Sequence, residues 1–354
     1  MNTMKIHSSL YDYTVEFMDD FSAAVAQFDE NTAFVIDQTV YKLYQARFSS
    51  IDMGRVFFME AVEHKKNMDT VMAIITFFQK IGVRKNWHIL CFGGGITQDV
   101  TTMASNLFLR NVDWYFFPTT LLAMCDSCIG GKCGINFNRL KNQLGVFYPP
   151  KKILIDPLFI KTLSEEDYLN GWGELLKFSL TSDPAFYEDI RKEPSLIPCE
   201  NIQSYIERGL MVKKRIIEED EFEADLRRVL NYGHTFGHAL EAYTDNDIPH
   251  GKGVIWGIDV VNFIAMREGL ITEEYYREIK AFIRRAFLKQ EIVIEDPDRL
   301  FSLIKTDKKV KGNIMNFALL DGASHLIVYP MAIDEKLHTL FADYLRTTHA
   351  YYHD

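Results

Sequence analysis

Residues 87–99, WHILCFGGGITQD, decide the fold of this chain. The apolar run 87–92 ends in three glycines, which is typical of a parallel strand buried on both faces of an α/β sheet. A stretch with helical spacing follows, so the sequence predicts a strand, a tight turn and a helix. Glycines at such a turn allow the backbone to approach a phosphate or pyrophosphate. The run is not G-x-G-x-x-G, so an ordinary turn is the alternative interpretation.

Three further segments share this apolar pattern and are predicted to be strands: TAFVID at 32–37, DWYFFPTT at 113–120 and KKILID at 151–156. Helical spacing over 66–82 falls between two of the predicted strands. Alternating strands and helices predict a doubly wound, mostly parallel sheet of the Rossmann type.

Beyond about residue 157 the pattern becomes mainly helical. The segments with 3.6-residue periodicity are DYLNGWGELLKFSL (167–180), IQSYIERGLMVKKRIIEEDEFEADLRRVL (202–230) and EEYYREIKAFIRRAFL (273–288). The acidic run 218–225 is interpreted as a solvated helix face. A chain of 354 residues exceeds the usual size of one hydrophobic core. We therefore predict an α/β domain over 1–156 and an α-helical domain over 157–354.

The charge balance narrows the possible functions. The chain has 39 Lys and Arg against 49 Asp and Glu, a net charge of −10. Surfaces that bind nucleic acid or anionic membranes are basic, so neither partner is expected. A local basic cluster could still bind a small anionic substrate. We find no apolar stretch long enough to span a bilayer and no signal peptide, and expect a cytoplasmic protein.

Five cysteines raise the question of a metal or iron–sulfur site. Cys125, Cys128 and Cys133 are close in sequence, but a fourth ligand would have to come from Cys91 or Cys199. Neither of those two stands in a paired motif, so small, partly buried thiols are the better interpretation.

The segment GHTFGHALE at 233–241 carries His234 and His238 four residues apart. Residues at i and i+4 lie on one helical face, where two imidazoles can bind metal or act as acid and base. His250, twelve residues further on beside a glycine, could close the site from a loop. Ordinary core or surface histidines are the alternative.

Two lysine-containing segments contain further candidate functional residues. In residues 118–148, Lys132 follows two glycines and Lys141 precedes Asn142, an arrangement that suits phosphate, although a solvated polar loop would look similar. In GWGELLK (171–177), Glu174 and Lys177 share a helix face, where most such pairs are weak surface ion pairs. The flanking glycines indicate a close approach, and a carboxylate with two imidazoles is a catalytic zinc set.

From about residue 37 to residue 310, the chain resembles 3-dehydroquinate synthase, a sugar phosphate cyclase. The motifs that carry the resemblance are GGGITQD, PTTLLAMCDSCIGGKCGIN, KNQLGVFYPPKKILID, GWGELLK, DEFEADLRRVLNYGHTFGHALEA, PHG and DKKV. The resemblance implies a homodimer with a Rossmann-like NAD-binding α/β domain and a mainly α-helical domain that binds metal and substrate. It also implies an active site in the cleft between the domains.

Matching motifs carry the family's functional residues to this chain. The implied metal ligands are Glu174, His234 and His250, with Zn²⁺ or Co²⁺ as the ion. The implied NAD-binding residues are Asp37, Glu63, Lys66, Gly94, Gly95, Asp99, Thr119, Thr120, Lys132 and Lys141. The implied phosphate-binding and elimination group is Lys132, Asn142, Asn231, His238 and Lys308 or Lys309. Lys213 and Arg227 would hold the substrate carboxylate, and Arg110 would enter the neighbouring subunit's site. Completing the pocket are Asp126, Lys141, Lys177 and Glu223.

The reaction implied is conversion of 3-deoxy-D-arabino-heptulosonate 7-phosphate to 3-dehydroquinate and phosphate, in the shikimate pathway of aromatic amino acid biosynthesis. It proceeds by transient oxidation, phosphate elimination, reduction and intramolecular aldol closure, so NAD is not consumed. Several cations in the pocket suit a substrate with a phosphate and a carboxylate.

Four positions depart from the family pattern. Gln98, Asn111 and Asp225 stand where glycine is usual, and Lys252 stands where glutamate is usual. These changes leave open another cyclase, acting on an amino analogue or on sedoheptulose 7-phosphate. A metal- and NAD-dependent alcohol dehydrogenase and a non-catalytic homologue are further alternatives, although no metal ligand is lost.

Overall fold

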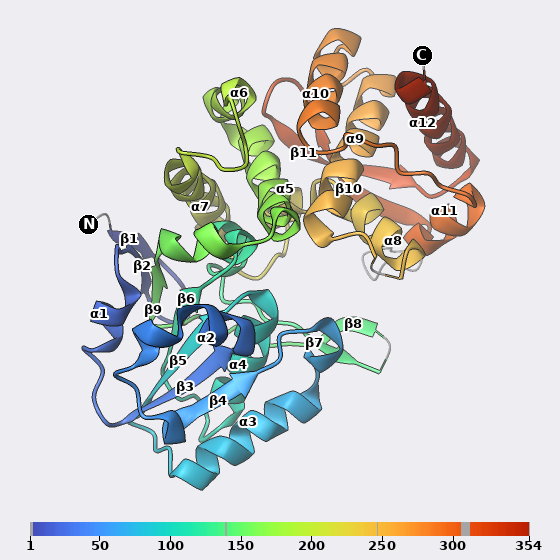
Figure 1. Ribbon diagram of the computed structural model, residues 1–354. Helices are drawn as coiled ribbons and strands as arrows, with labels where there is room; N and C mark the ends of the chain where they lie inside the picture. The colour runs from blue at the N-terminus through green and yellow to red at the C-terminus, as the bar shows by residue number, and fades with distance from the viewer. Residues whose placement is uncertain (1–2, 139, 246, 306–311, 354) are drawn as a thin grey trace. The chain divides into compact units, whose positions relative to one another are not determined.

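Two units, Met1–Tyr168 and Leu169–Asp354, make up the chain in a computed structural model (Figure 1). The structure describes residues 3–138, 140–245, 247–305 and 312–353. Helix α5 (Glu165–Ser182) contains the point of division.

A seven-stranded sheet organises the first unit, in the order β1-β2-β9-β6-β5-β3-β4. Only β1 runs antiparallel to its neighbour among these strands, and the other pairs are parallel. The strands are β1 (Thr3–Ile6), β2 (Tyr13–Phe17), β3 (Thr32–Asp37), β4 (Val56–Met59), β5 (His88–Gly93), β6 (Trp114–Pro118) and β9 (Lys152–Ile155). The predicted α/β class and all four predicted strands are confirmed by β3, β5, β6 and β9.

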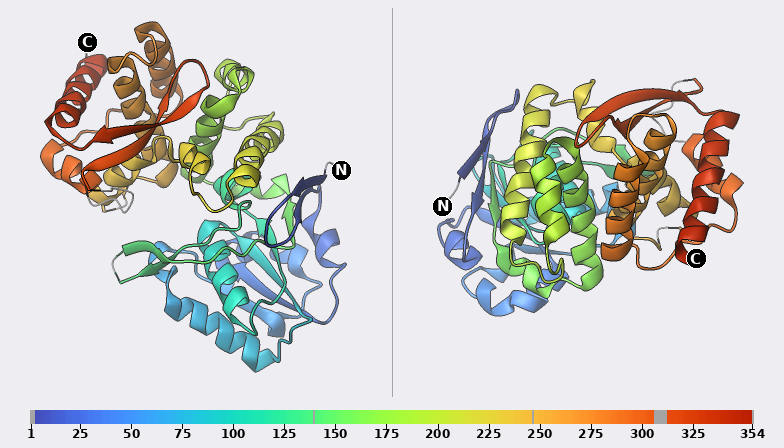
Figure 2. Two further views of the ribbon diagram at one scale, coloured as in Figure 1. Left: turned by 180° about the vertical axis from the view of Figure 1, so that it is seen from behind. Right: turned by 90° about the horizontal axis from the view of Figure 1, so that it is seen from above.

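Helices cover this sheet and position its loops (Figure 2). Helix α4 packs against β3, β5 and β6, and α3, which lies within the predicted helical segment 66–82, packs against α4. The helices of this unit are α1 (Phe21–Val25), α2 (Gln38–Tyr44), α3 (Met68–Ile81) and α4 (Gly95–Leu107). Shorter turns are η1 (Gln45–Phe48), η2 (Met53–Arg55), η3 (Glu63–Lys65), η4 (Ala123–Ser127) and η5 (Pro157–Thr162). A hairpin of β7 (Ile135–Phe137) and β8 (Leu140–Leu144) projects beyond the main sheet.

Aromatic side chains fill the core of the first unit. Phe92 of β5 stacks on Phe117 of β6 with ring centroids 4.1 Å apart, and Phe21 stacks on Phe159. These rings are buried, which accounts for the apolar strand sequences.

The second unit is mainly helical, as predicted. Its helices after α5 are α6 (Pro184–Lys192), α7 (Ile202–Glu219), η6 (Leu226–Asn231), α8 (His234–Tyr243), α9 (His250–Arg267), α10 (Glu273–Ala286), α11 (Pro297–Lys305) and α12 (Glu335–His353). A hairpin of β10 (Ile314–Leu320) and β11 (Leu326–Ala332), which the sequence pattern did not predict, packs on α9 (Figure 2). None of the helices in the described ranges has the length and apolar character to cross a membrane.

The predicted continuous helix over 202–230 is wrong. Helix α7 ends at Glu219, and the acidic run is mostly a loop. The Asp220 carboxylate causes the break, because it accepts hydrogen bonds from the backbone N–H groups of Ala224, Asp225 and Arg227. An aspartate that binds nearby backbone donors competes with the helical hydrogen bonds.

Candidate metal and dinucleotide sites

Glycines allow three helices of the second unit to approach closely. A methyl group at Gly173 of α5 would lie 2.5 Å from the Gly251 carbonyl oxygen of α9. A methyl group at Gly257 of α9 would overlap the carbonyl oxygen of Gly233, which precedes α8. The interpretation of Gly173 as a close-approach residue is therefore confirmed. These crossings bring Glu174 of α5 next to the first residues of α8 and α9.

Glu174, His234 and His250 form a compact group. One potential ligand atom from each lies within 4.8 Å of the others. Glu174 Oε1 is 3.4 Å from His234 Nε2 and 3.3 Å from His250 Nε2. His250 is the first residue of α9, not a loop residue as predicted, so the helix fixes its position.

The second nitrogen of each imidazole has its own partner. His234 Nδ1 donates to the Tyr232 carbonyl at 3.1 Å, and His250 Nδ1 donates to Glu241 Oε1 at 2.8 Å. Both Nε2 atoms therefore face Glu174. Such outer partners orient metal-binding histidines in proteins. Sequence reasoning missed Glu241, although it ends the quoted GHTFGHALE motif on the same helix.

The ionisable side chains of this group shift one another's pKa values. Burial lowers the pKa of His234, although the charge of Glu174 opposes this change. Burial opposes ionisation of Glu174, but the charges of Lys177 and His234 hold its pKa well below the usual range. Burial opposes protonation of His250, but hydrogen bonds to Glu174 and Glu241 raise its pKa to about 10. These donors fit a divalent ion such as Zn²⁺ or Co²⁺.

Lys177 and His238 flank the group. Lys177 is 2% exposed and forms an ion pair with Glu174, so it is not the weak surface pair that the spacing alone suggests. The His238 ring is exposed and lies 5.3 Å from the His234 ring and 5.8 Å from the His250 ring, between centroids. It also forms a second potential ligand group with Glu241 and His250.

The predicted carboxylate-binding residues come from α7 and η6. Lys213 and Arg227 are each 6% exposed, which contradicts the alternative that they are surface cations. The Arg227 guanidinium donates to the Glu221 carbonyl, and its backbone is held by Asp220. Asn231, at the end of η6, donates to Glu223 Oε1 at 3.1 Å. Since η6 leads directly into α8, the chain places Asn231 three residues before His234.

In the first unit, the predicted dinucleotide residues follow the carboxyl ends of parallel strands. Asp37 ends β3, Gly94 and Gly95 follow β5, and Thr119 and Thr120 follow β6. Neighbouring parallel strands bring these residues to one edge, where α/β sheets bind ligands. The Thr119 N–H donates to the Gly93 carbonyl, and a methyl group at Gly94 would lie 2.9 Å from Thr120. Burial raises the pKa of Asp37.

A second group joins the same edge to the β7–β8 hairpin. Lys66 Nζ lies 2.6 Å from Asp99 Oδ2 and donates to Asn142 Oδ1 at 2.8 Å. Burial raises the pKa of Asp99, although Lys66 opposes this change. Glu63 accepts a hydrogen bond from Asn136 of β7 at 2.8 Å. The structure thus brings together Glu63, Lys66, Asp99 and Asn142.

Gln98, a departure from the family pattern, is buried and forms two hydrogen bonds with Ser127. Its Nε2 donates to the Ser127 carbonyl at 2.7 Å, and Ser127 Oγ donates to its Oε1 at 2.6 Å. Ser127 ends the π-helical turn η4, which also contains Asp126. Gln98 therefore ties the glycine turn to the segment that carries Asp126.

The remaining predicted residues are more exposed or undescribed. Lys132, Lys141 and Arg110 are exposed. Lys308 and Lys309 lie outside the described residues. All five cysteines are buried, and burial raises the pKa of Cys91 and of Cys133 to about 12. Neither of the potential ligand groups found among the described residues includes a cysteine.

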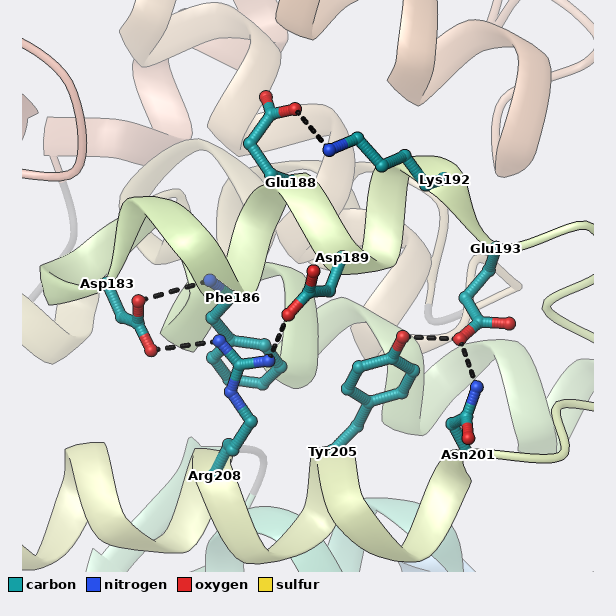
Figure 3. A network of polar contacts seen from close by, with 9 residues as sticks. All are labelled: Asp183, Phe186, Glu188, Asp189, Lys192, Glu193, Asn201, Tyr205 and Arg208. Atoms are coloured by element: carbon teal, nitrogen blue, oxygen red, sulfur yellow. Dashed lines mark hydrogen bonds and ion pairs between the residues drawn. The ribbon is translucent and has the colours of Figure 1, made fainter.

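A separate polar network lies between α6 and α7 (Figure 3). Arg208 pairs with Asp183 and Asp189 over the Phe186 ring, while Glu193 accepts from Asn201 and Tyr205. The adjacent hollow of about 440 Å³ is lined by Asp189, Lys192, Glu193, Pro194, Asn201, Ser204, Tyr205 and Arg208. Because Arg208 is already paired with two carboxylates, this network joins the helices and offers no clear anion site.

Comparisons with known proteins agree with the motifs. Two family models match adjacent parts of the chain: 3-dehydroquinate synthase N-terminal over residues 56–170, and 3-dehydroquinate synthase C-terminal over residues 171–310. A 3-dehydroquinate synthase from Alkaliphilus metalliredigens (strain QYMF) is 32% identical over 318 residues, 88% of this chain and 89% of the relative.

Solved structures share the fold. A 2-deoxy-scyllo-inosose synthase, complexed with carbaglucose-6-phosphate, NAD⁺ and Co²⁺, has a TM-score of 0.83 at 22% identity, covering 98% of this chain and 99% of its own. The 2-epi-5-epi-valiolone synthase ValA from Streptomyces hygroscopicus subsp. jinggangensis 5008, with NAD⁺ and Zn²⁺ bound, has a TM-score of 0.83 at 25% identity, covering 95% and 96%. The two family models, which together match most of the sequence, and the 32% identical relative show that the chain belongs to the 3-dehydroquinate synthase family.

Proposed function

We propose that this chain is a 3-dehydroquinate synthase, which converts 3-deoxy-D-arabino-heptulosonate 7-phosphate to 3-dehydroquinate and phosphate in the shikimate pathway. The burial of Lys213 and Arg227 carries the choice of substrate, because buried cations suit a ligand carboxylate. A cyclase for a sugar phosphate without a carboxylate would not need this pair.

Glu174, His234 and His250 would hold a divalent ion, and the edge formed by Asp37, Gly94 and Thr119 would hold NAD⁺. When bound, NAD⁺ supplies transient hydride transfer and the metal supplies Lewis-acid polarisation of the substrate oxygen. The cyclase structures with NAD⁺ and Co²⁺ or Zn²⁺ support this assignment.

The chain's own side chains would orient the substrate. Arg227 can hold a carboxylate with two parallel hydrogen bonds, while Lys213 adds a point charge. Lys132, Asn142, Asn231 and His238 would bind the phosphate with Lys308 or Lys309. The leaving phosphate, held by these residues, would itself accept the proton that is removed during elimination. We further propose a homodimer in which Arg110 completes the partner's site; its exposure is consistent with that role.

The decisive experiment is phosphate release by the enzyme with NAD⁺ and Zn²⁺ or Co²⁺. We expect turnover of 3-deoxy-D-arabino-heptulosonate 7-phosphate and little turnover of sedoheptulose 7-phosphate. Arg227→Ala should lower kcat/KM for the carboxylate substrate by an amount that corresponds to about 2–5 kcal/mol of transition-state stabilisation, because the substrate carboxylate is left without its charge partner. Arg228→Ala, at the adjacent half-buried position, is the matched control and should have little effect.

Gln98 favours one alternative. Its amide is fixed to Ser127 at the position where glycine is usual, and this change could select a different substrate. Preference of the wild type for sedoheptulose 7-phosphate or an amino analogue would replace the dehydroquinate synthase assignment with that of another sugar phosphate cyclase.

A further inference from the structure

The turn after α4 contains three consecutive left-handed residues. Leu109, Arg110 and Asn111 have φ angles of 50°, 55° and 76°, and none is glycine. This conformation is unfavourable for residues with a Cβ atom, and successive occurrences are unusual. Asn111 is the best suited of the three, because asparagine tolerates the left-handed region better than most residues.

Hydrogen bonds fix both ends of this turn. The Asn111 N–H donates to the Asn106 carbonyl at 2.9 Å, and the Asn106 side-chain amide donates to Asn111 Oδ1 at 2.9 Å. The Val112 N–H donates to the Ser105 carbonyl at 2.8 Å. These bonds return the chain to β6, but they leave the three left-handed carbonyl groups for another partner.

Lys85 supplies that partner from the loop between α3 and β5. Its Nζ lies within 3.5 Å of the carbonyl oxygens of Leu109, Arg110 and Asn111. An ammonium group has three donors and one positive charge, so it can bind three converging carbonyl dipoles. Lys85 thereby stabilises the backbone conformation that the side chains disfavour.

The unfavourable backbone conformation of this turn is not offset by burial of its side chains. Leu109 is 47% exposed, and Arg110 is exposed as well. Residues held in unfavourable backbone conformations by their surroundings cluster at functional sites. The geometry points to Lys85 as a positioning residue, which holds the turn so that the Arg110 guanidinium is presented to an anionic group of the substrate. This inference rests on the proposed function, in which Lys213 and Arg227 hold the carboxylate and Arg110 completes the partner's site, where it would join the residues that bind the phosphate.

Lys85→Met tests the clamp, with Lys85→Arg as the conservative variant and Lys80→Met, at an exposed lysine of α3, as the matched control. We expect Lys85→Met to lower kcat/KM by roughly 10- to 100-fold, as misplacement of a positioning group does. Arg110→Ala should cause a similar loss, and the double variant should lose no more than Arg110→Ala alone. Lys85→Arg should recover most of the activity. Additive losses in the double variant would show that Lys85 acts independently of Arg110 and would overturn the inference.

Two readouts do not depend on turnover. Hydrogen exchange of the amides of residues 109–112 should accelerate in Lys85→Met and stay unchanged in Lys80→Met. Inorganic phosphate, titrated in the presence of NAD⁺ and Zn²⁺, should bind more weakly to Lys85→Met and to Arg110→Ala, without additivity. If the wild type turns over none of the substrates while these two results hold, the proposed function fails and the clamp stands. Unchanged exchange or unchanged phosphate affinity in Lys85→Met contradicts the clamp itself.

Discussion

At the scale of the residue, Glu241 orients the imidazole ring of His250. It accepts the Nδ1 proton at 2.8 Å, so Nε2 is directed toward Glu174. The Tyr232 carbonyl has the same role for His234. The two histidines are therefore oriented by neighbours that are not themselves members of the Glu174 group.

Glu241→Gln should lower the affinity for Zn²⁺ or Co²⁺ by about 10- to 100-fold, because the amide is a weaker acceptor for the histidine proton. Competition against a chelator would measure the affinity, and circular dichroism would verify the fold. Glu274→Gln, an exposed position on α10, is the control. Equal metal affinity in Glu241→Gln and the wild type would exclude the orienting role.

At the scale of the element, a buried ion pair joins three helices of the second unit. Lys280 of α10 donates to Asp259 of α9 at 3.0 Å and to Thr348 of α12 at 3.0 Å. Tyr344 of α12 donates to the same Asp259 oxygen at 3.0 Å. Lys280 and Asp259 are each 4% exposed, so the loss of either partner leaves a charge in the core.

Lys280→Met should therefore reduce the free energy of unfolding by about 3–5 kcal/mol. Urea unfolding would measure the change, with Lys289→Met at an exposed position as the control. The double variant Lys280→Met, Asp259→Leu should recover much of the loss, because no unpaired charge remains. A double variant as unstable as Lys280→Met would show that packing, rather than the unpaired carboxylate, causes the effect.

The sequence predicted those elements whose pattern is local. Strands β3, β5, β6 and β9 are continuous apolar runs because both faces are buried, and such runs are recognisable without their neighbours. The end of α7 was missed because it depends on Asp220, one polar residue within a charged run. The β10–β11 hairpin was also missed. A close approach was expected from Gly173, but the partner Gly251 of α9 became known only from the structure.

At the scale of the whole molecule, the candidate ligand sites are divided between the two units. The proposed NAD⁺ residues Asp37, Gly94 and Thr119 belong to the first unit, and the metal group belongs to the second. In the proposed assignment, the first unit would hold NAD⁺ and the second unit would hold the metal ion.

This division yields a test that separates a cyclase from a dehydrogenase. In the proposed reaction the hydride returns to the substrate, so NAD⁺ at far less than the substrate concentration should support many turnovers, with no accumulation of NADH absorbance. NADH formed in proportion to substrate would instead support the dehydrogenase alternative.

Removal of the metal by chelation, or by His234→Ala, should abolish phosphate release, because the substrate oxygen would lack the cation that polarises it. NAD⁺ should still raise the thermal unfolding temperature of His234→Ala, because a ligand stabilises the folded state that binds it and the dinucleotide residues lie in the other unit. Full activity in a metal-free preparation would contradict the metal assignment.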